Sequence, residues 1–215
     1  MTTTRSIGVA LAIILGLAPR AAAITFNEIG DAGNLPAFSQ AAGVVPVLTT
    51  ITGSIGSSTS TDADMFAISF SQAGTFSATT VGTPGTLDDT QLFLFRFPGQ
   101  GVVANDDSNF TLRSRVSSTV TPGLYFLGIS GFDVDPVSPG GLIFPSFPFD
   151  AVFGPTGPGG GSAITGWQGF GTTGTYTIAL DLQPVPEPGT FLLFGSALAG
   201  GAWVRARFGS RRGRS

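Results

Sequence analysis

Residues 64–70 read DMFAISF and carry the clearest β-strand signal in the chain. Phe66, Ile68 and Phe70 share one face of an extended segment, and the residues between them share the other, because successive side chains of a strand point to opposite sides. An apolar residue at every second position predicts a strand with one face in a core.

The same alternation recurs on both sides of this segment. Residues 175–182, TYTIALDL, place Tyr176, Ile178, Leu180 and Leu182 on one face. Residues 91–97, QLFLFRF, are apolar on both faces until Arg96, which predicts a central strand. The predicted strands are Thr49–Ile55, Asp64–Phe70, Gly74–Val81, Gln91–Phe97, Gly101–Ala104, Ser114–Val120, Leu124–Ser130 and Thr175–Leu182.

Eight short strands at spacings near ten residues, without helical periodicity, predict an all-β fold. We expect an antiparallel β-sandwich or jelly roll. The residues expected to be buried are Phe66, Ile68, Phe70, Phe93, Phe95, Tyr125, Leu127, Ile129 and Ile178.

The segment 132–174 departs from this rhythm. It contains 11 Gly and 6 Pro, which makes it too broken for regular sheet, yet it is rich in aromatic residues, unlike a disordered linker. We expect an ordered excursion that packs against the sandwich, and long loops of this kind are often functional.

Composition excludes several classes of function. The chain has no Cys, no His and no Lys, which removes thiolate nucleophiles, imidazole bases and Cys-type zinc sites. Between Ile24 and Gln183 there are 12 acids and three Arg, a net charge of −9. A segment this acidic is a poor partner for nucleic acid, and no residue pattern in it indicates an enzyme.

The N-terminus has the pattern of a secretory signal peptide. Arg5 precedes the apolar run Ile7–Ala18, and Ala21-Ala22-Ala23 supplies the small residues that signal peptidase accepts at Ala21 and Ala23. The run of 12 residues is too short to span a bilayer as a helix, although a retained anchor or a core helix is the alternative reading. We predict cleavage after Ala23.

The C-terminus has three parts in a fixed order. Val185-Pro186-Glu187-Pro188 forms a turn, residues 189–204 are uncharged and mostly apolar, and five of the last eleven residues are Arg. These 16 residues give about 24 Å of helix, short for a membrane span but workable with an interfacial anchor such as Trp203. The arginines place the tail on the cytoplasmic side. A plain tail anchor is the alternative.

This tail resembles the PEP-CTERM sorting signal of Gram-negative bacteria. The resemblance implies that an exosortase, a membrane protease, recognises the motif Val185–Pro188 and removes the helix. It implies a protein that is exported, anchored transiently in the inner membrane and passed to the cell surface or extracellular matrix. The expected organisation is then a signal peptide at 1–23, a β-sandwich domain at 24–183 and a sorting signal at 184–215.

The central domain resembles the bacterial pre-peptidase C-terminal domain, a β-sandwich often attached to secreted proteases. The segments that carry this resemblance are IGDAGN, TDADMFAISF, SQAGTFSATT, LDDTQLFLFRFPGQGVVANDD and VTPGLYFLGIS, in that order from about Asn27 to Gly131. No protease domain is present in the sequence given, which leaves a protease-accessory role without support.

Paired aspartates at predicted strand ends are the candidate metal ligands. Asp62, Asp64, Asp106 and Asp107 are the preferred calcium ligands, because the flanking strands can bring their two turns to one end of the sandwich and Ca²⁺ takes about six to eight oxygen ligands. The alternative is that these residues only cap turns through their own backbone.

Two functions without catalysis remain. The first is a structural or adhesive protein of the surface matrix, associated with exopolysaccharide and stabilised by calcium. The second is a carbohydrate-binding module in which Trp167 stacks on a sugar; the alternative for Trp167 is a loop anchor packed inward. Exposure of Trp167 would favour sugar binding, and burial the structural role.

Overall fold

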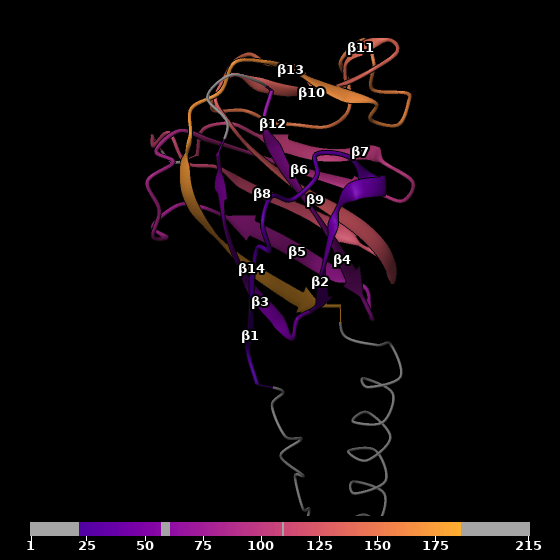
Figure 1. Ribbon diagram of the computed structural model, residues 1–215. Helices are drawn as coiled ribbons and strands as arrows, with labels where there is room; N and C mark the ends of the chain where they lie inside the picture. The colour runs from indigo at the N-terminus through magenta and orange to yellow at the C-terminus, as the bar shows by residue number, and fades with distance from the viewer. Residues whose placement is uncertain (1–21, 57–60, 109, 186–215) are drawn as a thin grey trace, which may run out of the picture.

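The computed structural model describes residues 22–56, 61–108 and 110–185, which form three layers of β-sheet (Figure 1). The first layer has the strand order β1-β3-β14-β5-β8 and the second the order β12-β7-β6-β9-β4-β2. The third is a small sheet, β11-β10-β13, which lies at the top of the view in Figure 1. An all-β sandwich was predicted, and the two large sheets confirm it.

The strand bounds follow the predicted ones closely. The first sheet consists of β1 (Ile24–Asn27), β3 (Leu48–Ile55), β14 (Gly174–Pro184), β5 (Gly74–Thr79) and β8 (Arg115–Val120). The second consists of β12 (Val152–Phe153), β7 (Gln100–Asn105), β6 (Thr90–Arg96), β9 (Gly123–Gly131), β4 (Ala63–Phe70) and β2 (Gln40–Val45). The third consists of β11 (Gly141–Leu142), β10 (Val134–Ser138) and β13 (Gly166–Gly169). In the described residues the only helical element is the 3-10 turn Pro36–Phe38.

Two of the pairings correct the expectation of purely antiparallel sheets. β1 pairs with β3 in parallel, and β2 pairs with β4 in parallel. Both strands come from the segment before Thr49, where the sequence shows little alternation of apolar and polar residues. Backbone hydrogen bonds to a neighbouring strand hold these two strands in place, and Phe26 of β1 and Ala42 and Val45 of β2 add to the main core.

The main core lies between the two large sheets, and a second core lies behind the six-stranded sheet. Phe66, Ile68 and Phe70 of β4 face Tyr176 and Ile178 of β14 in the first core. Phe93 and Phe95 of β6 belong to the second core, where residues of the small sheet cover them. All nine residues that were expected to be buried are buried.

The segment 132–174 is more regular than expected. It contains the small sheet as well as β12, whose Val152 pairs with Asn105 of β7. The expectation of an irregular excursion was wrong on this point, because the strands are very short and most of the Gly and Pro residues lie in the turns between them. The segment does pack on the sandwich, and it explains why the central strand β6 is apolar on both faces.

Candidate cation site

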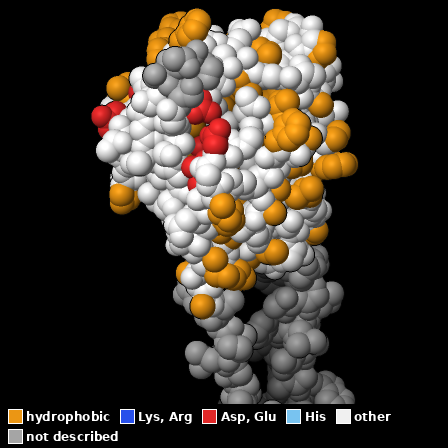
Figure 2. Space-filling view, in the orientation of Figure 1, with side chains coloured by type: hydrophobic (Ala, Val, Ile, Leu, Met, Phe, Trp, Pro, Cys, Tyr) orange, Lys and Arg blue, Asp and Glu red, His pale blue; other side chains and the backbone are white. Residues whose placement is uncertain are grey.

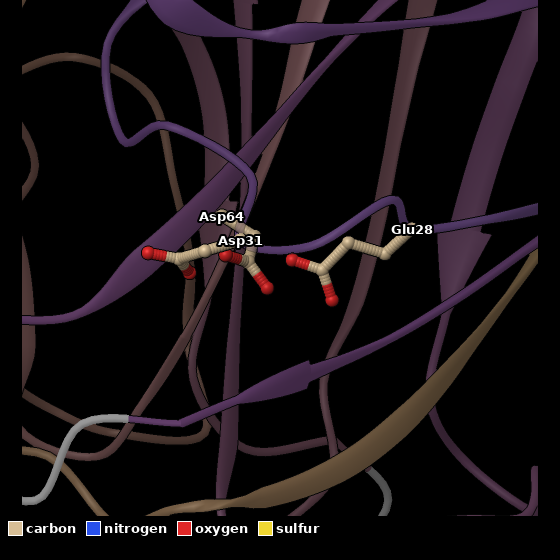
Figure 3. A group of neighbouring side chains, drawn as sticks. All are labelled: Glu28, Asp31 and Asp64. Carbon is tan, nitrogen blue, oxygen red and sulfur yellow. The ribbon is translucent and has the colours of Figure 1, made fainter.

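Three carboxylates meet where the chain leaves β1 of the five-stranded sheet and passes toward β2 of the six-stranded sheet. Glu28 follows β1, Asp31 lies in the loop after it, and Asp64 is the second residue of β4. One carboxylate oxygen of each lies within 4.8 Å of the others. Figure 3 shows the carboxylate of Glu28 directed toward Asp31, next to Asp64.

Asp64 is the unusual member of this group, because it is completely buried. It shares the face of β4 that carries Phe66, so its side chain points between the two large sheets. The Tyr176 hydroxyl, from the opposite sheet, donates a 2.5 Å hydrogen bond to Oδ2. The other oxygen, Oδ1, is buried without a hydrogen-bond partner. A buried, unsatisfied carboxylate oxygen is costly.

Burial raises the pKa of Asp64 to about 8. The hydrogen bond from Tyr176 lowers this pKa, and the negative charges of Glu28, Asp62 and Asp31 raise it. Without a counter-charge, the folded protein therefore holds Asp64 protonated at neutral pH.

Glu28 is held in place by the backbone on both sides. Its Oε1 accepts a hydrogen bond from the Ala32 amide at 2.8 Å, and its Oε2 accepts one from the Ser54 amide at 2.8 Å. Gly53, beside Ser54 on β3, leaves room for these groups, since a Cβ there would collide with the Tyr176 hydroxyl and the Glu28 carboxylate. The position of Glu28 is therefore set by the pairing of β1 with β3.

This arrangement suits a hard divalent cation. The three carboxylates offer only oxygen atoms, the ligands that Ca²⁺ and Mg²⁺ prefer. A groove of about 410 Å³ lined by Asn27, Glu28 and Thr175 opens beside the group, and Asp31 is exposed, so water has access. A cation here would satisfy Asp64 Oδ1 and, once Asp64 has lost its proton, offset the repulsion among the carboxylates, which at an effective dielectric near 20 costs about 4 kcal/mol for two charges 4 Å apart.

A second acidic group lies beyond the end of β7. One oxygen each of Asp89, Asp106 and Asp107 lies within 4.8 Å of the others, and Oδ1 of both Asp89 and Asp106 is buried without a partner. Burial, together with the neighbouring carboxylates, raises the pKa of Asp106 to about 8. The three side chains are only partly buried, so this group is the weaker of the two as a cation site.

Three of the four predicted calcium ligands are divided between these two groups, Asp64 in the first and Asp106 and Asp107 in the second, whereas Asp62 belongs to neither. Register links Asp64 to Ile129, Ile129 to Leu92 and Leu92 to Asn105, so the turn carrying Asp106 lies three strand positions away from Asp64. At about 4.8 Å per strand this is about 14 Å, too far for one ion.

The partners of Asp64 in the first group are residues that the sequence analysis did not select. Glu28 and Asp31 lie more than thirty residues before Asp64 and form no pair with each other in sequence. Asp62 accepts a hydrogen bond from the Gly56 amide at 2.9 Å and adds negative charge near Asp64.

Trp167 is a core residue, which corrects its selection as a sugar contact. It is only 8% exposed and packs edge-on against Phe93, with ring centroids 5.3 Å apart. Its Nε1 donates a 2.6 Å hydrogen bond to the carbonyl of Asn34. A sugar ring has no open indole face to stack on.

The ends of the chain are described only in part. Ala23 is exposed directly before β1, and Val185 directly follows β14, whereas Ala21, Pro186, Glu187 and Pro188 lie outside the described residues. The expected membrane helix at 189–204 lies outside them too. Within the described ranges, no helix is long and apolar enough to cross a membrane.

Comparison with protein families settles what the tail is. The model of the PEP-CTERM protein-sorting motif matches residues 184–207. The chain carries a PEP-CTERM sorting signal. The signal marks an exported protein that is sorted by an exosortase, as the tail predicted. It begins at Pro184, the last residue of β14.

The domain before the PEP-CTERM signal is less similar to known proteins. No curated protein matches the chain. Among solved structures, the chain is similar to the pre-peptidase C-terminal domain of a collagenase from Bacillus anthracis, with 10% identity and a TM-score of 0.35 over 76% of this chain and 100% of that one. The sequence resembles the same module.

Proposed function

We propose that this chain is a structural or adhesive protein of the cell surface or extracellular matrix, associated with exopolysaccharide and without enzymatic activity. Signal peptidase cleaves after Ala23, the arginine tail holds the protein in the inner membrane, and an exosortase then cuts near Val185–Pro188. The mature protein is the β-sandwich domain.

The observation that carries this proposal is where the sorting motif begins. The matched segment starts at Pro184, which still pairs with Gly74 of β5, and the Val185 amide donates to the carbonyl of Ala73 at 3.2 Å. The last strand of the described domain therefore runs up to the start of the motif, as expected if the remainder of the chain is a removable sorting signal.

Substitution of the motif tests the sorting step. We expect a chain with Glu187→Ala and Pro188→Ala to accumulate in the inner membrane with its tail intact, while the unaltered chain loses the tail. Mass spectrometry of the mature protein from culture would read both termini. A substituted chain that reaches the medium fully processed would contradict the sorting role.

Binding of a divalent cation is the second part of the proposal, with calcium as the candidate cofactor. Its support is the unpartnered Oδ1 of Asp64 beside Glu28 and Asp31. A ligand at a hundredfold excess over its dissociation constant stabilises a fold by about 2.7 kcal/mol. We expect the melting temperature of the mature protein to be higher in millimolar calcium than in chelator. Equal melting temperatures would leave the aspartates as turn-capping residues.

The alternative of a carbohydrate-binding module has less support. Its proposed stacking residue, Trp167, is buried. Association with exopolysaccharide would then depend on polar side chains. The groove beside Glu28, lined by Asn27, Thr52 and Thr175, is the surface to test first.

A further inference from the structure

The two ends of the sandwich differ in charge. The acidic groups around Asp64 and Asp106 lie at one end, where β4 begins and β7 finishes. Figure 2 shows acidic side chains gathered in the upper part of the visible face, whereas the lower part of the described surface shows apolar and uncharged side chains. This lower end is where β14 finishes in Figure 1.

Strand register shows which turns lie at the uncharged end. Val45 pairs with Phe70, Phe70 with Gly123, and Gly74 with both Val120 and Pro184, so four turns lie together there. These turns are residues 46–47, 71–73, 97–99 and 121–122, and none contains an acid or a base. Among the described residues, the charged ones close to these turns in the strands are Arg96, which bonds Gln100, and Asp181; Glu187 follows in the connection to the tail.

This end also exposes apolar side chains. Phe97 is 65% exposed and hydrogen-bonds through its amide to the carbonyl of Leu124, which is 40% exposed. The other large apolar side chains exposed here are Ile24, Val44 and Val185. Exposed apolar residues also occur at the acidic end, as at Phe170, but that end also carries the two acidic groups. An apolar surface without charge can enter a low-dielectric phase without the cost of burying an ion.

The short connection after Val185 limits which end of the domain can face the membrane. Three residues separate Val185 from the uncharged segment 189–204. Four Cα steps span at most about 14 Å. β14 alone has 11 residues and so is about 36 Å long, which means that so short a connection cannot let the domain turn its acidic end toward the membrane.

We propose that the uncharged end of the sandwich docks on the lipid bilayer while the protein is anchored, with Val44, Phe97 and Leu124 in the interfacial region. This rests on the proposed insertion of the tail. Interfacial contact of this kind gains from buried apolar area. The domain then stands with its acidic end away from the membrane, so the candidate cation site faces the periplasmic space.

Labelling of single cysteines in the full chain tests the orientation, since the natural chain has no Cys. The chain is reconstituted in phosphatidylcholine vesicles, with and without brominated acyl chains, and an environment-sensitive fluorophore is attached at one site at a time. The test sites are Phe97→Cys and Leu124→Cys. The matched control is Phe170→Cys, which is 84% exposed at the acidic end. Leu192→Cys reports on insertion of the tail.

We expect blue-shifted emission and quenching by brominated lipid at positions 97, 124 and 192, and neither effect at position 170. Quenching at 192 alone would overturn docking while leaving the tail anchor intact. Absence of quenching at 192 would contradict both the anchor and the docking. A shift at 97 that depends on protein concentration and not on brominated lipid would show a second copy on this face and would also overturn docking.

A charge placed on the face supplies an independent check. Leu124→Asp should reduce the quenching of a fluorophore at Val44→Cys, because an ion at the interface opposes insertion. Phe170→Asp, the control, should leave that quenching unchanged. Equal quenching in both variants would contradict docking through this face.

Discussion

At the scale of single residues, Asp64 shows how a candidate site arises when an acidic residue occupies a core position. Along β4, alternate positions carry Phe66, Ile68 and Phe70 into the main core, and Asp64 occupies the next position of the same series. The backbone therefore directs a carboxylate to a place built for an apolar side chain. Only Tyr176, from the opposite sheet, donates to it among the described hydrogen bonds.

We predict that Asp64→Asn removes the dependence on calcium. In chelator the variant should melt at or above the temperature of the unaltered protein near neutral pH, because its side chain does not have to take up a proton on folding. In calcium it should gain little, because a ligand is lost. Thermal melting with both additives measures this. Asp181→Asn, an exposed control away from both acidic groups, should keep the full increase in melting temperature with calcium. The same increase in Asp64→Asn would contradict the site.

Trp167 gives a prediction of the opposite kind, in which stability changes and sugar binding does not. Trp167→Ala should destabilise the domain by about 3–5 kcal/mol, typical of removing a large aromatic side chain from a core. Chemical denaturation gives this value. Trp167→Phe should recover part of it, and binding of the protein to purified exopolysaccharide should be the same for Trp167→Phe and the unaltered chain. Selective loss of binding in Trp167→Phe would return this residue to the role of a sugar contact.

At the scale of elements, the small sheet acts as a cover for one face of β6. It brings Trp167 of β13 and Val134 of β10 over Phe93 and Phe95. Without this cover, two Phe side chains of a central strand would be exposed to water. The glycines of segment 132–174 permit the close turns that fold so short a sheet.

Gly169 provides a test of this cover. Its φ is +115°, and a Cβ there would collide with the carbonyl of Asp133 on the paired segment. Gly169→Ala should therefore separate β10 from β13 and destabilise the domain by more than about 1 kcal/mol. Gly161→Ala, with open space around its Cα, is the matched control. Similar denaturation midpoints for the two variants would show that the cover contributes little to stability.

At the scale of the whole molecule, the charge distribution makes stability depend on pH. Burial is the main cause that raises the pKa of Asp64 and Asp106 to about 8, and of Asp89 and Asp135 to about 6. Their ordinary value is 3.8, so the folded protein binds more protons than the unfolded chain between these limits. The contribution to stability is complete below about pH 4 and is lost as the pH rises through the folded values.

We therefore predict that, in chelator, the melting temperature is higher near pH 5 than near pH 8.5. Calcium should raise it more at the higher pH, because carboxylates must lose their protons to bind metal. Thermal scans in matched buffers measure both effects. A melting temperature in chelator that increases over this range would mean that these carboxylates are charged and satisfied in the folded protein without a cation.

Much of the fold follows from local pattern alone. The alternation in residues 64–70, 91–97 and 175–182 predicts strands, and the double-faced apolar strand at 91–97 predicts its own central place. These signals are local because side-chain direction in a strand has a period of two. The sorting signal is local as well, since its order of turn, apolar segment and arginines is read along the chain.

The tertiary structure alone decided which acids meet. Asp64 joins Glu28 and Asp31 because β1 pairs with β3 in parallel and the chain then passes to the sheet that contains β4, a contact between segments more than thirty residues apart. Asp106, at the same end of the sheet, is kept away from Asp64 by two intervening strands. The pairing of strands across a sheet sets these distances. Neither the composition of the chain nor the spacing of the acids along it indicates which strands pair. The same applies to Trp167, whose burial depends on the small sheet that folds over β6.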